Sequence, residues 1–329
     1  MIKSFCLDSA GNFQEDLTRE KIAQVIQDKK SLLWLELDTP TEDEIKILSE
    51  VFNFHILAIE DCKGYTDLPK IDEFEDYSFI VIHAVSYDIE NDEVKKPELD
   101  IFVSKNYVVT VHLEPLKTIT VNTDKVRKNP QLLSKGADFL LYNLLNVLVS
   151  NYSPLLEYFD DMIEEIEGSV LMSSEIQDIV PTIMDLKRKI LALRRSASLQ
   201  RDVISRLARR DSPIISNKNV VFFRDVYDHM VRIHELLEIS RDLLSSTFEI
   251  YVSSISNRMN EIMKRLTIVA TIFMPLTFIS SIYGMNFNTK ASHFNMPELN
   301  WTYGYLYVVG MMLAIAIGML GYFKYRKWM

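Results

Sequence analysis

The sequence predicts an α/β domain at the N-terminus, a long α-helical stalk after it, and a two-helix transmembrane hairpin at the C-terminus. Three observations lead to this prediction. Strand-like and helical segments alternate in the first part of the chain, the stretch 214–274 contains neither glycine nor proline, and two uncharged apolar stretches, 266–287 and 302–323, lie close together near the C-terminus. A bilayer core is crossed by about 20 residues of helix, so each apolar stretch is long enough to span it.

The composition fits a water-soluble body with a small part in lipid. The 329 residues carry 46 acidic and 36 basic side chains, a net charge of -10, and the mean hydropathy of +0.02 is too low for a transporter with many spans. The acidic balance argues against nucleic-acid binding. Cys6 and Cys62 stand alone and are expected to be reduced cytosolic thiols. The first residues lack the apolar segment of a signal peptide, so we expect the body in the cytosol.

Residues 1–137 are expected to form the α/β domain. The segments 31–37 and 78–87 are rich in β-branched and aromatic residues, as strands are. The segments 99–104 and 107–112 flank Lys105-Asn106, which predicts a β-hairpin.

A helix is expected to follow Thr41, because Glu44 stands three residues later and completes a capping-box pattern. Strands interleaved with helices favour an α/β sandwich.

The region 138–213 changes to helical periodicity and separates its charges. The segment 157–167 is acidic without a base, whereas 187–210 is strongly basic. The basic run has two interpretations: an anion or nucleic-acid patch, or one of two antiparallel helices with complementary charged faces. The second interpretation is favoured, since the residues around Gly168 and Pro181 could turn the chain.

The stretch 214–265 predicts a stalk that continues into the first span as one helix of roughly 100 Å, at 1.5 Å per residue. Its apolar residues alternate three- and four-residue steps, which predicts one packed seam. A long amphipathic stalk has little to bury against within one chain, so we infer an oligomer. The seam comprises Val226, Met230, Ile233, Leu237, Leu244, Phe248, Tyr251, Ile255, Met259, Ile262 and Leu266.

The orientation of the hairpin follows from its flanking charges. Basic residues precede the first span and follow the second, whereas the loop between them carries only Lys290 and Glu298. The positive-inside rule therefore puts both ends in the cytoplasm. The expected divisions are 1–137 for the cytosolic α/β domain, 138–213 for the cytosolic helical hairpin, 214–265 for the stalk, 266–287 for the first span, 288–301 for the external loop, 302–323 for the second span and 324–329 for a basic cytosolic tail.

Two spans cannot enclose a water-filled path, but several copies around an axis can. One face of the first span mixes amide, hydroxyl, small and methionine side chains, a pattern that suits a pore and also ordinary helix contacts. Leu266 and Met274 would form apolar rings on it, which can gate by dewetting. The face comprises Asn260, Met263, Leu266, Thr267, Ala270, Met274, Thr277 and Ser281, and the opposite face includes Ile268, Ile272, Phe273, Leu276 and Ile279.

The loop carries a recognisable signature. Tyr283-Gly284-Met285-Asn286-Phe287, followed by Met296-Pro297-Glu298-Leu299, resembles the signature of the CorA family of magnesium channels. Further similarity lies in the first span, in 223–229 of the stalk and in 69–77, so it covers nearly the whole chain.

The resemblance implies a homopentameric funnel in which the first span lines the pore and Gly284, Met285 and Asn286 form a selectivity ring. Mg²⁺ dehydrates reluctantly, so neutral Asn286 carboxamides suit the hydrated ion better than carboxylates, which could trap it. Co²⁺ and Ni²⁺ are expected to permeate as well. No GxxxxGK[ST] sequence and no set of nucleophile, base and orienting residue is present, so neither a pump nor an enzyme is expected, and no organic cofactor.

The resemblance also implies regulation by cytosolic Mg²⁺ bound between subunits. The matching positions are Asp225 on the stalk and Asp88 after the segment 78–87. The alternative is that both carboxylates are solvated or capping groups. Lys324, Arg326 and Lys327 are membrane anchors, and in related proteins such residues form a basic ring at the inner pore mouth.

The loop departs from the family pattern because it is longer, and Glu298 is its only carboxylate. Recruitment of cations at the mouth is therefore expected to be weaker. A zinc-transporting branch shares the architecture, so transport of Zn²⁺ or another divalent ion is an alternative. A non-conducting membrane-tethered scaffold is a more distant one.

Overall fold

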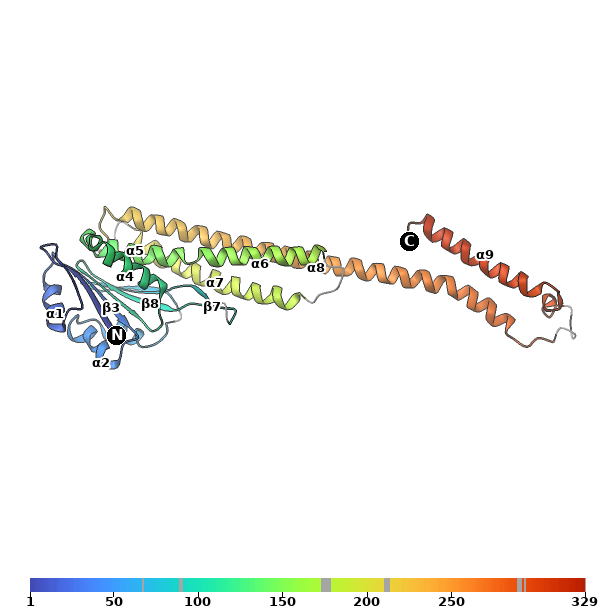
Figure 1. Ribbon diagram of the computed structural model, residues 1–329, viewed down its shortest axis with the longest axis horizontal. Helices are drawn as coiled ribbons and strands as arrows, with labels where there is room; N and C mark the ends of the chain where they lie inside the picture. The colour runs from blue at the N-terminus through green and yellow to red at the C-terminus, as the bar shows by residue number, and fades with distance from the viewer. Residues whose placement is uncertain are drawn as a thin grey trace. The chain divides into compact units, whose positions relative to one another are not determined.

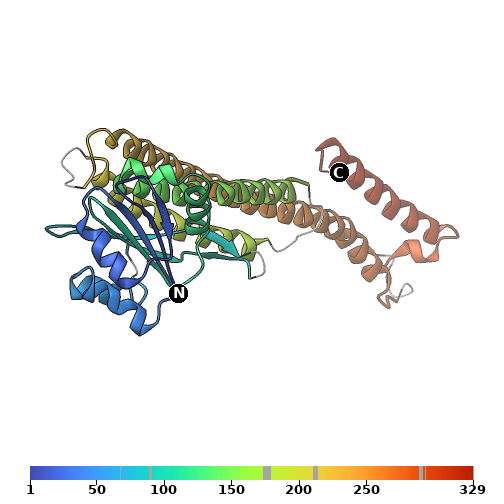
Figure 2. The same cartoon turned by 60° about the vertical axis from the view of Figure 1, so that its left-hand side comes forward.

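The computed structural model describes residues 1–66, 68–88, 91–172, 179–209, 214–288, 292 and 294–328. The chain divides into two compact units, Met1–Phe248 and Glu249–Met329. One helix, α8 (Val220–Tyr283), begins in the first unit and ends in the second. Each unit is described on its own (Figures 1 and 2).

The first unit is built on a seven-stranded sheet in the order β2-β1-β3-β9-β8-β5-β4. Neighbouring strands are antiparallel except β3 and β9, which are parallel. Nearly all side chains of the four central strands are buried, so both faces of the sheet are covered. The strands are β1 (Ile2–Leu7), β2 (Phe13–Glu15), β3 (Leu32–Asp38), β4 (Lys70–Glu73), β5 (Ser78–His83), β8 (Glu98–Val103) and β9 (Tyr107–His112).

Alternation along the strands sends successive side chains to two different cores. Leu33, Leu35 and Leu37 of β3 face a core with the short helices α1 (Arg19–Gln27), α2 (Glu42–Glu50) and α3 (Ile56–Asp61). Leu32 and Trp34 face the opposite core, which includes α4 (Lys117–Lys128), the 3-10 turn η1 (Pro130–Lys135) and the long helices that follow. Figure 2 shows the sheet between these two sets of helices. The predicted α/β sandwich is confirmed.

Most of the predicted local elements are present. The segments 31–37 and 99–112 form β3 and the β8–β9 hairpin, in which Val103 pairs with Val108. The hydroxyl oxygen of Thr41 accepts from the backbone nitrogen of Glu44, and the Glu44 carboxylate accepts from the backbone nitrogen of Thr41, which confirms the capping box.

The prediction of one strand over 78–87 is wrong. The segment forms β5, which ends at His83, and a separate β6 (Ser86–Asp88) that pairs with β7 (Glu93–Lys95) in a two-stranded sheet. The nitrogen of Ala84 still donates to the carbonyl of Pro97 at 2.8 Å. Pro97 has no N–H to continue the ladder, and this is the physical reason that the pairing of β5 with β8 stops there.

Four helices pack on the α4 side of the sheet: α5 (Ala137–Ser150), α6 (Ser153–Met172), α7 (Val180–Leu207) and the first part of α8. The side chains of Val226, Met230, Leu237 and Leu244 on α8 are fully buried in the core that these helices share. The expectation that the stalk has little to bury against within one chain is therefore wrong for this part of α8. Beyond Phe248, Met259, Ile262 and Leu266 of the seam are exposed, so only this part of the seam favours self-association.

The charged faces of α6 and α7 do not pair as predicted. Among the described residues, the cross-element ion pairs of α7 join Lys189 to Asp92, Arg194 to Glu238 and Arg206 to Glu73, and none reaches α6. The acidic side chains of α6 instead accept hydrogen bonds from hydroxyl groups of α8, as Asp160 does from Ser240 and Glu167 from Thr247.

The second unit contains the end of α8, a 3-10 turn η2 (Pro297–Asn300) and α9 (Gly304–Tyr325). Two helices, α8 and α9, are long and apolar enough to cross a membrane. Helix α8 runs through Pro275 without a break and ends at Tyr283, four residues before the predicted end of the first span. Helix α9 begins and ends two residues later than the predicted second span.

Candidate functional site

The proposed pore-lining face of the first span lies on the outside of the single chain. The side chains of Asn260, Met263, Leu266, Ala270, Met274, Thr277 and Ser281 are all exposed. Met274 and Leu266 are 72% and 59% exposed, which is unusual for apolar side chains packed within one chain. This face is thus available to another copy or to a pore.

The opposite face of the span is largely covered. Ile268 is 7% exposed, and Ile272, Leu276 and Ile279 are half-buried, whereas Phe273 is 62% exposed. Helix α9 runs antiparallel next to this part of α8 (Figure 1). Phe273 therefore departs from its predicted face neighbours and is a candidate for contact with lipid.

A hollow of about 700 Å³ lies beside the exposed side of the span, and Met319 of α9 forms part of its wall. Its walls are almost entirely apolar, and four residues of the predicted pore-lining face contribute to them. The lining residues are Leu266, Thr267, Ala270, Thr271, Met274, Pro275, Phe278 and Met319.

The basic ends of the two spans meet. The ammonium of Lys264 donates a hydrogen bond of 3.2 Å to the backbone carbonyl of Lys327. Lys324 and Arg326 are exposed at the same end of α9. The hairpin therefore gathers positive charge at the end opposite the signature loop, as the charge pattern of the sequence predicts.

The signature turn follows directly from the end of α8. The nitrogen of Gly284 donates to the carbonyl of Ser280 at 2.9 Å. A Cβ at Gly284 would lie 3.3 Å from that oxygen, so a side chain there would crowd the helix end. Met285 and Asn286 are exposed. Within the described residues the Asn286 carboxamide has no hydrogen-bond partner, which leaves its donors and acceptor free for a ligand or for water.

Glu298 is held by the turn itself. The hydroxyl of Tyr283 donates to Oε1 of Glu298 at 2.8 Å. A Cβ at Gly304 would lie 2.1 Å from the carbonyl oxygen of Glu298, so only glycine permits this approach. Sequence reasoning did not pair Tyr283 with Glu298. The position of Tyr283 as the first residue of the motif 283–287 was the one signal that could have pointed to it. Lys290, the other predicted loop charge, lies outside the described residues.

Asp225 occupies an outward face of α8. It is exposed and makes no ion pair within the described residues. About three helical turns further on, the same face carries Leu236, Ile239, Leu243 and Ile250, which are 39%, 54%, 45% and 48% exposed. This apolar row is a surface for which the described chain offers no cover.

Asp88 ends β6 and is already engaged. The ammonium of Lys95 lies 2.6 Å from Oδ2 of Asp88. The side-chain nitrogen of Asn91 donates to the same oxygen at 2.9 Å, and its backbone nitrogen donates to Oδ1 at 3.2 Å. The hydrogen bond from Lys95, helped by those from Asn91, holds the pKa of Asp88 well below its usual value. Sequence reasoning missed Lys95, because the pairing of β6 with β7 could not be read from the chain.

Within the described part of the single chain, no cluster of three or more His, Cys, Asp or Glu side chains could hold a metal ion. Asp88 and Asp225 lie on separate elements, β6 and α8. A cation site built from them would draw on surfaces that face outward from the chain.

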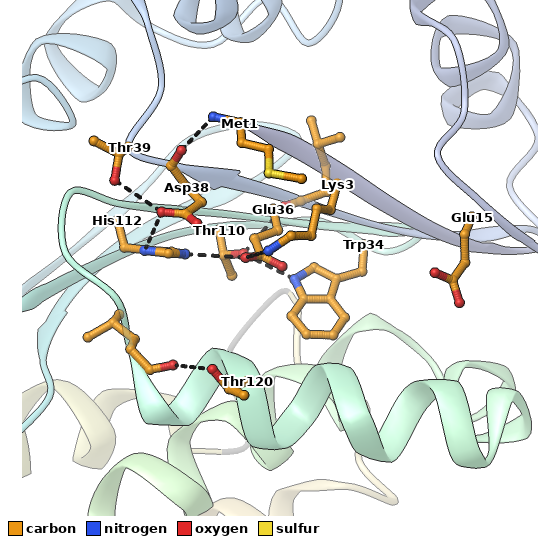
Figure 3. Close-up of polar contacts among 12 residues, drawn as sticks. Met1, Lys3, Glu15, Trp34, Glu36, Asp38, Thr39, Thr110, His112 and Thr120 are labelled. Carbon is orange, nitrogen blue, oxygen red and sulfur yellow. Dashed lines mark hydrogen bonds and ion pairs between the residues drawn. The ribbon is translucent and has the colours of Figure 1, made fainter.

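Two buried polar groups lie in the sheet. In the first, Glu36 is 2% exposed and receives a hydrogen bond of 2.9 Å from Lys3, and Nε2 of His112 lies 3.5 Å away (Figure 3). Burial disfavours the charged Glu36, but the nearby imidazole of His112 and the hydrogen bond from Lys3 outweigh it and lower the pKa of the carboxyl. This group ties β1, β3 and β9 together and is structural.

The second group lines a cavity of about 340 Å³ at the start of β8. Oε2 of Glu98 accepts a hydrogen bond from the backbone nitrogen of Thr66, but Oε1 of Glu98 and Oδ1 of Asp100 are buried without a donor. Burial and the charge of Glu98 raise the pKa of Asp100 well above its usual value. A proton on Asp100 would let this carboxyl group donate to Glu98, which would satisfy both orphaned oxygens.

Comparisons with known proteins agree with the fold and the signature. Residues 29–326 match the family model described as CorA-like Mg²⁺ transporter protein. The chain is 40% identical over 288 residues to the cobalt/magnesium transport protein CorA of Thermotoga maritima, covering 87% of this chain and 80% of that protein. It is 26% identical over 317 residues to the protein of the same name from Methanocaldococcus jannaschii, covering 95% and 96%.

The fold itself is shared with a solved structure. The complete structure of the CorA magnesium transporter from Methanocaldococcus jannaschii superimposes with a TM-score of 0.82 at 24% identity, covering 99% of this chain and 98% of that one. It has the same N-terminal α/β domain, long helix and two apolar C-terminal helices. Members of this family are metal-ion transporters of the membrane rather than enzymes. With the match extending over nearly its whole length, the chain belongs to the CorA-like Mg²⁺ transporter family.

Proposed function

We propose that this chain forms a homopentameric channel of the cell membrane that conducts Mg²⁺ passively into the cytosol, together with Co²⁺ and Ni²⁺. The observation that carries the proposal is the exposed face of α8 that runs from Asn260 to Ser281 and leads to the exposed Asn286. A face that mixes polar and methionine side chains, backed by a covered apolar face, suits a wall between water and packed helices. Both termini lie in the cytoplasm.

Selection takes place at a ring of Gly284, Met285 and Asn286. Mg²⁺ gives up its waters reluctantly, so a filter of neutral carboxamides and carbonyls can bind the hydrated ion through those waters. The free Asn286 carboxamide supports this role, since both its donors and its acceptor are available. A neutral ring also keeps binding weak enough for the ion to leave.

The gate lies deeper in the span. Leu266 and Met274 are highly exposed on the single chain. In a ring of five copies they form apolar constrictions that close by dewetting and open when the subunits move apart. Asn260 provides a polar ring at the cytosolic side of this gate.

Assembly of the five copies uses the outward row of α8. Leu236, Ile239, Leu243 and Ile250 are exposed at helical spacing on the face that also carries Asp225. Burial of the exposed half of each side chain against a second copy is favourable by about 1 kcal/mol. The contact also places Asp225 at the boundary between subunits.

Cytosolic Mg²⁺ closes the channel by bridging Asp225 of one subunit and Asp88 of another. Without the ion the two carboxylates repel each other, and with the ion bound they are held together. The ion therefore shifts the balance between two states of the subunit interface. The inward current needs no other energy source. A divalent ion that moves down a negative-inside potential gains about 4.6 kcal/mol per 100 mV.

The test is a flux assay on the purified full-length protein in liposomes with an internal Mg²⁺-sensitive dye. With internal Mg²⁺ removed and a negative-inside potential, we expect Mg²⁺ entry that Asn286→Ala strongly reduces. Asn300→Ala, which changes an amide in η2 outside the signature turn, serves as the matched control and should retain flux. Absence of flux from protein shown to be oligomeric would reject the channel and favour a scaffold.

The same assay run with Co²⁺, Ni²⁺ and Zn²⁺ identifies the ion. Preference for Zn²⁺ over Mg²⁺ would favour the zinc-transporting alternative. Preference for Mg²⁺, Co²⁺ and Ni²⁺ is the expected result, because their hydrated ions are similar in size.

A further inference from the structure

The β6–β7 hairpin presents two unlike faces. Its register pairs Ser86 with Lys95, Tyr87 with Val94 and Asp88 with Glu93. Because side chains alternate across a strand, Tyr87 and Val94 share one face, and Asp88, Glu93 and Lys95 share the other. The face with Tyr87 and Val94 packs against helices, and the other face carries the charged side chains.

The first face anchors the hairpin to the helices. The hydroxyl groups of Tyr87 and Tyr158 form a hydrogen bond of 2.8 Å between β6 and α6, and their ring centroids are 4.5 Å apart. Asp92, in the turn that precedes β7, accepts a hydrogen bond of 2.5 Å from Lys189 of α7. The hairpin is therefore fixed from one side against two helices of its own subunit.

The second face carries the carboxylate of Asp88. Glu93 stands directly opposite it, and two carboxylates so placed repel each other. Lys95 lies on the diagonal, within reach of a long side chain, and its ammonium sits 2.6 Å from Asp88. The hydrogen bond and the charge of Asp88 raise the pKa of Lys95, and the charges of Glu114 and Glu93 add to this effect.

We propose that Lys95 is a built-in competitor for the cation at Asp88 and sets the concentration of Mg²⁺ at which the channel closes. This inference rests on the proposed function, in which Asp88 is a ligand of the regulatory ion. The Asp88 carboxylate can bind Mg²⁺ only after the ammonium of Lys95 has moved away. An oxygen that holds an ammonium at 2.6 Å cannot also be a ligand of a dication, because the two positive charges would repel each other at close range.

Mg²⁺ can replace Lys95 at Asp88 because the two side chains differ in mobility. The side chain of Lys95 is 49% exposed and flexible, whereas the side chain of Asp88 is 18% exposed and held by Asn91. Lys95 can therefore leave while Asp88 stays in place, and Glu93 offers the departing ammonium a second carboxylate. Each ion bound thus costs one broken Asp88–Lys95 pair.

Lys95→Met tests the competition, because methionine keeps most of the length of the side chain and removes its charge. Lys96→Met is the matched control, since it removes the same charge one residue away and Lys96 has no ion pair within the described residues. Full-length protein stripped with EDTA is titrated with Mg²⁺, and closure is followed by protection from limited proteolysis and by loss of flux.

Half-maximal protection of Lys95→Met is expected at a Mg²⁺ concentration about two- to fivefold lower than for the wild type, in proportion to the usual strength of an exposed ion pair. Lys95→Arg should stay near the wild type, and Asp88→Asn with Lys95→Met should behave as Asp88→Asn alone. If Mg²⁺ protects the wild type, but Lys95→Met and Lys96→Met reach half-maximal protection at the same Mg²⁺ concentration, then the inference about Lys95 is wrong and the proposed regulatory function stands. No Mg²⁺-dependent protection in any variant would overturn the regulatory function and the inference with it.

Discussion

The hydroxyl of Tyr283 donates a hydrogen bond of 2.8 Å to Oε1 of Glu298 and thereby closes the signature loop on itself. Tyr283 is the last residue of α8, and Glu298 lies in η2 just before α9. The contact joins the two signature segments, 283–287 and 296–299. It assigns Glu298 a positioning role in addition to the cation recruitment that its charge suggests.

This relationship predicts that Tyr283→Phe lowers Mg²⁺ flux several-fold and lowers the thermal midpoint of unfolding, because the turn that carries Asn286 loses this hydrogen bond. Glu298→Gln keeps an oxygen that can accept the tyrosine hydrogen bond and removes only the charge. It is therefore expected to retain most of the flux at high Mg²⁺. A collapse of flux in Glu298→Gln with normal flux in Tyr283→Phe would show that charge, and not the hydrogen bond, is what matters.

A second prediction concerns Asp88 and Asp225, the two carboxylates proposed to bind regulatory Mg²⁺. Asp88→Asn combined with Asp225→Asn should raise the internal Mg²⁺ concentration that closes the channel by about tenfold or more, the scale on which lost metal-site contacts reduce affinity. Asp228→Asn, on the same exposed helix, is the control and should close as the wild type does. The measurement is the patch-clamp current as a function of internal Mg²⁺ concentration. If the double variant closes at the same internal Mg²⁺ concentration as the wild type, the assignment of these two residues is wrong.

A third prediction concerns assembly. Leu243 is 45% exposed in the outward row of α8. Leu243→Asp should dissociate the oligomer in mild detergent, because a charge buried in an apolar contact is strongly unfavourable. Leu243→Met conserves volume and apolar character and should leave the oligomer intact. Mass measured by light scattering gives the answer, and an unchanged oligomer of Leu243→Asp would remove this row from the interface.

A fourth prediction follows from the raised pKa of Asp100. The folded state retains a proton that the unfolded chain loses near pH 4, so the stability that this group contributes is full below about pH 4 and falls as pH rises through the folded pKa. Asp100→Asn donates to Glu98 at every pH. The variant should therefore lose less stability than the wild type as pH rises above about 4.

Denaturant unfolding of the full chain in detergent measures this effect. Asp76→Asn, an exposed aspartate in the turn before β5, is the control and should follow the wild-type pH dependence. If Asp100→Asn also follows the wild type, then Asp100 is ionised in the folded protein and no proton is shared with Glu98.

The sequence by itself determined the elements whose signals are local. The hydrophobic stretches marked both spans, because only the length and polarity of one segment decide whether it suits a bilayer. Thr41 and Glu44 marked the start of α2, because the two side chains that cap a helix lie within one turn of each other. The absence of glycine and proline between 214 and 274 similarly predicted the single long helix α8.

The tertiary structure alone decided which surfaces are covered and which charges meet. Periodicity gave the apolar seam of α8 as one row, yet its first part is buried against helices of the same chain, whereas Met259 and Ile262 are exposed. Arg194 pairs with Glu238 of α8 and not with the acidic helix nearest to it in sequence. Lys95 reaches Asp88 because Pro97 ends one ladder and a second hairpin begins. Such contacts join residues that are distant along the chain, and packing in three dimensions selects them.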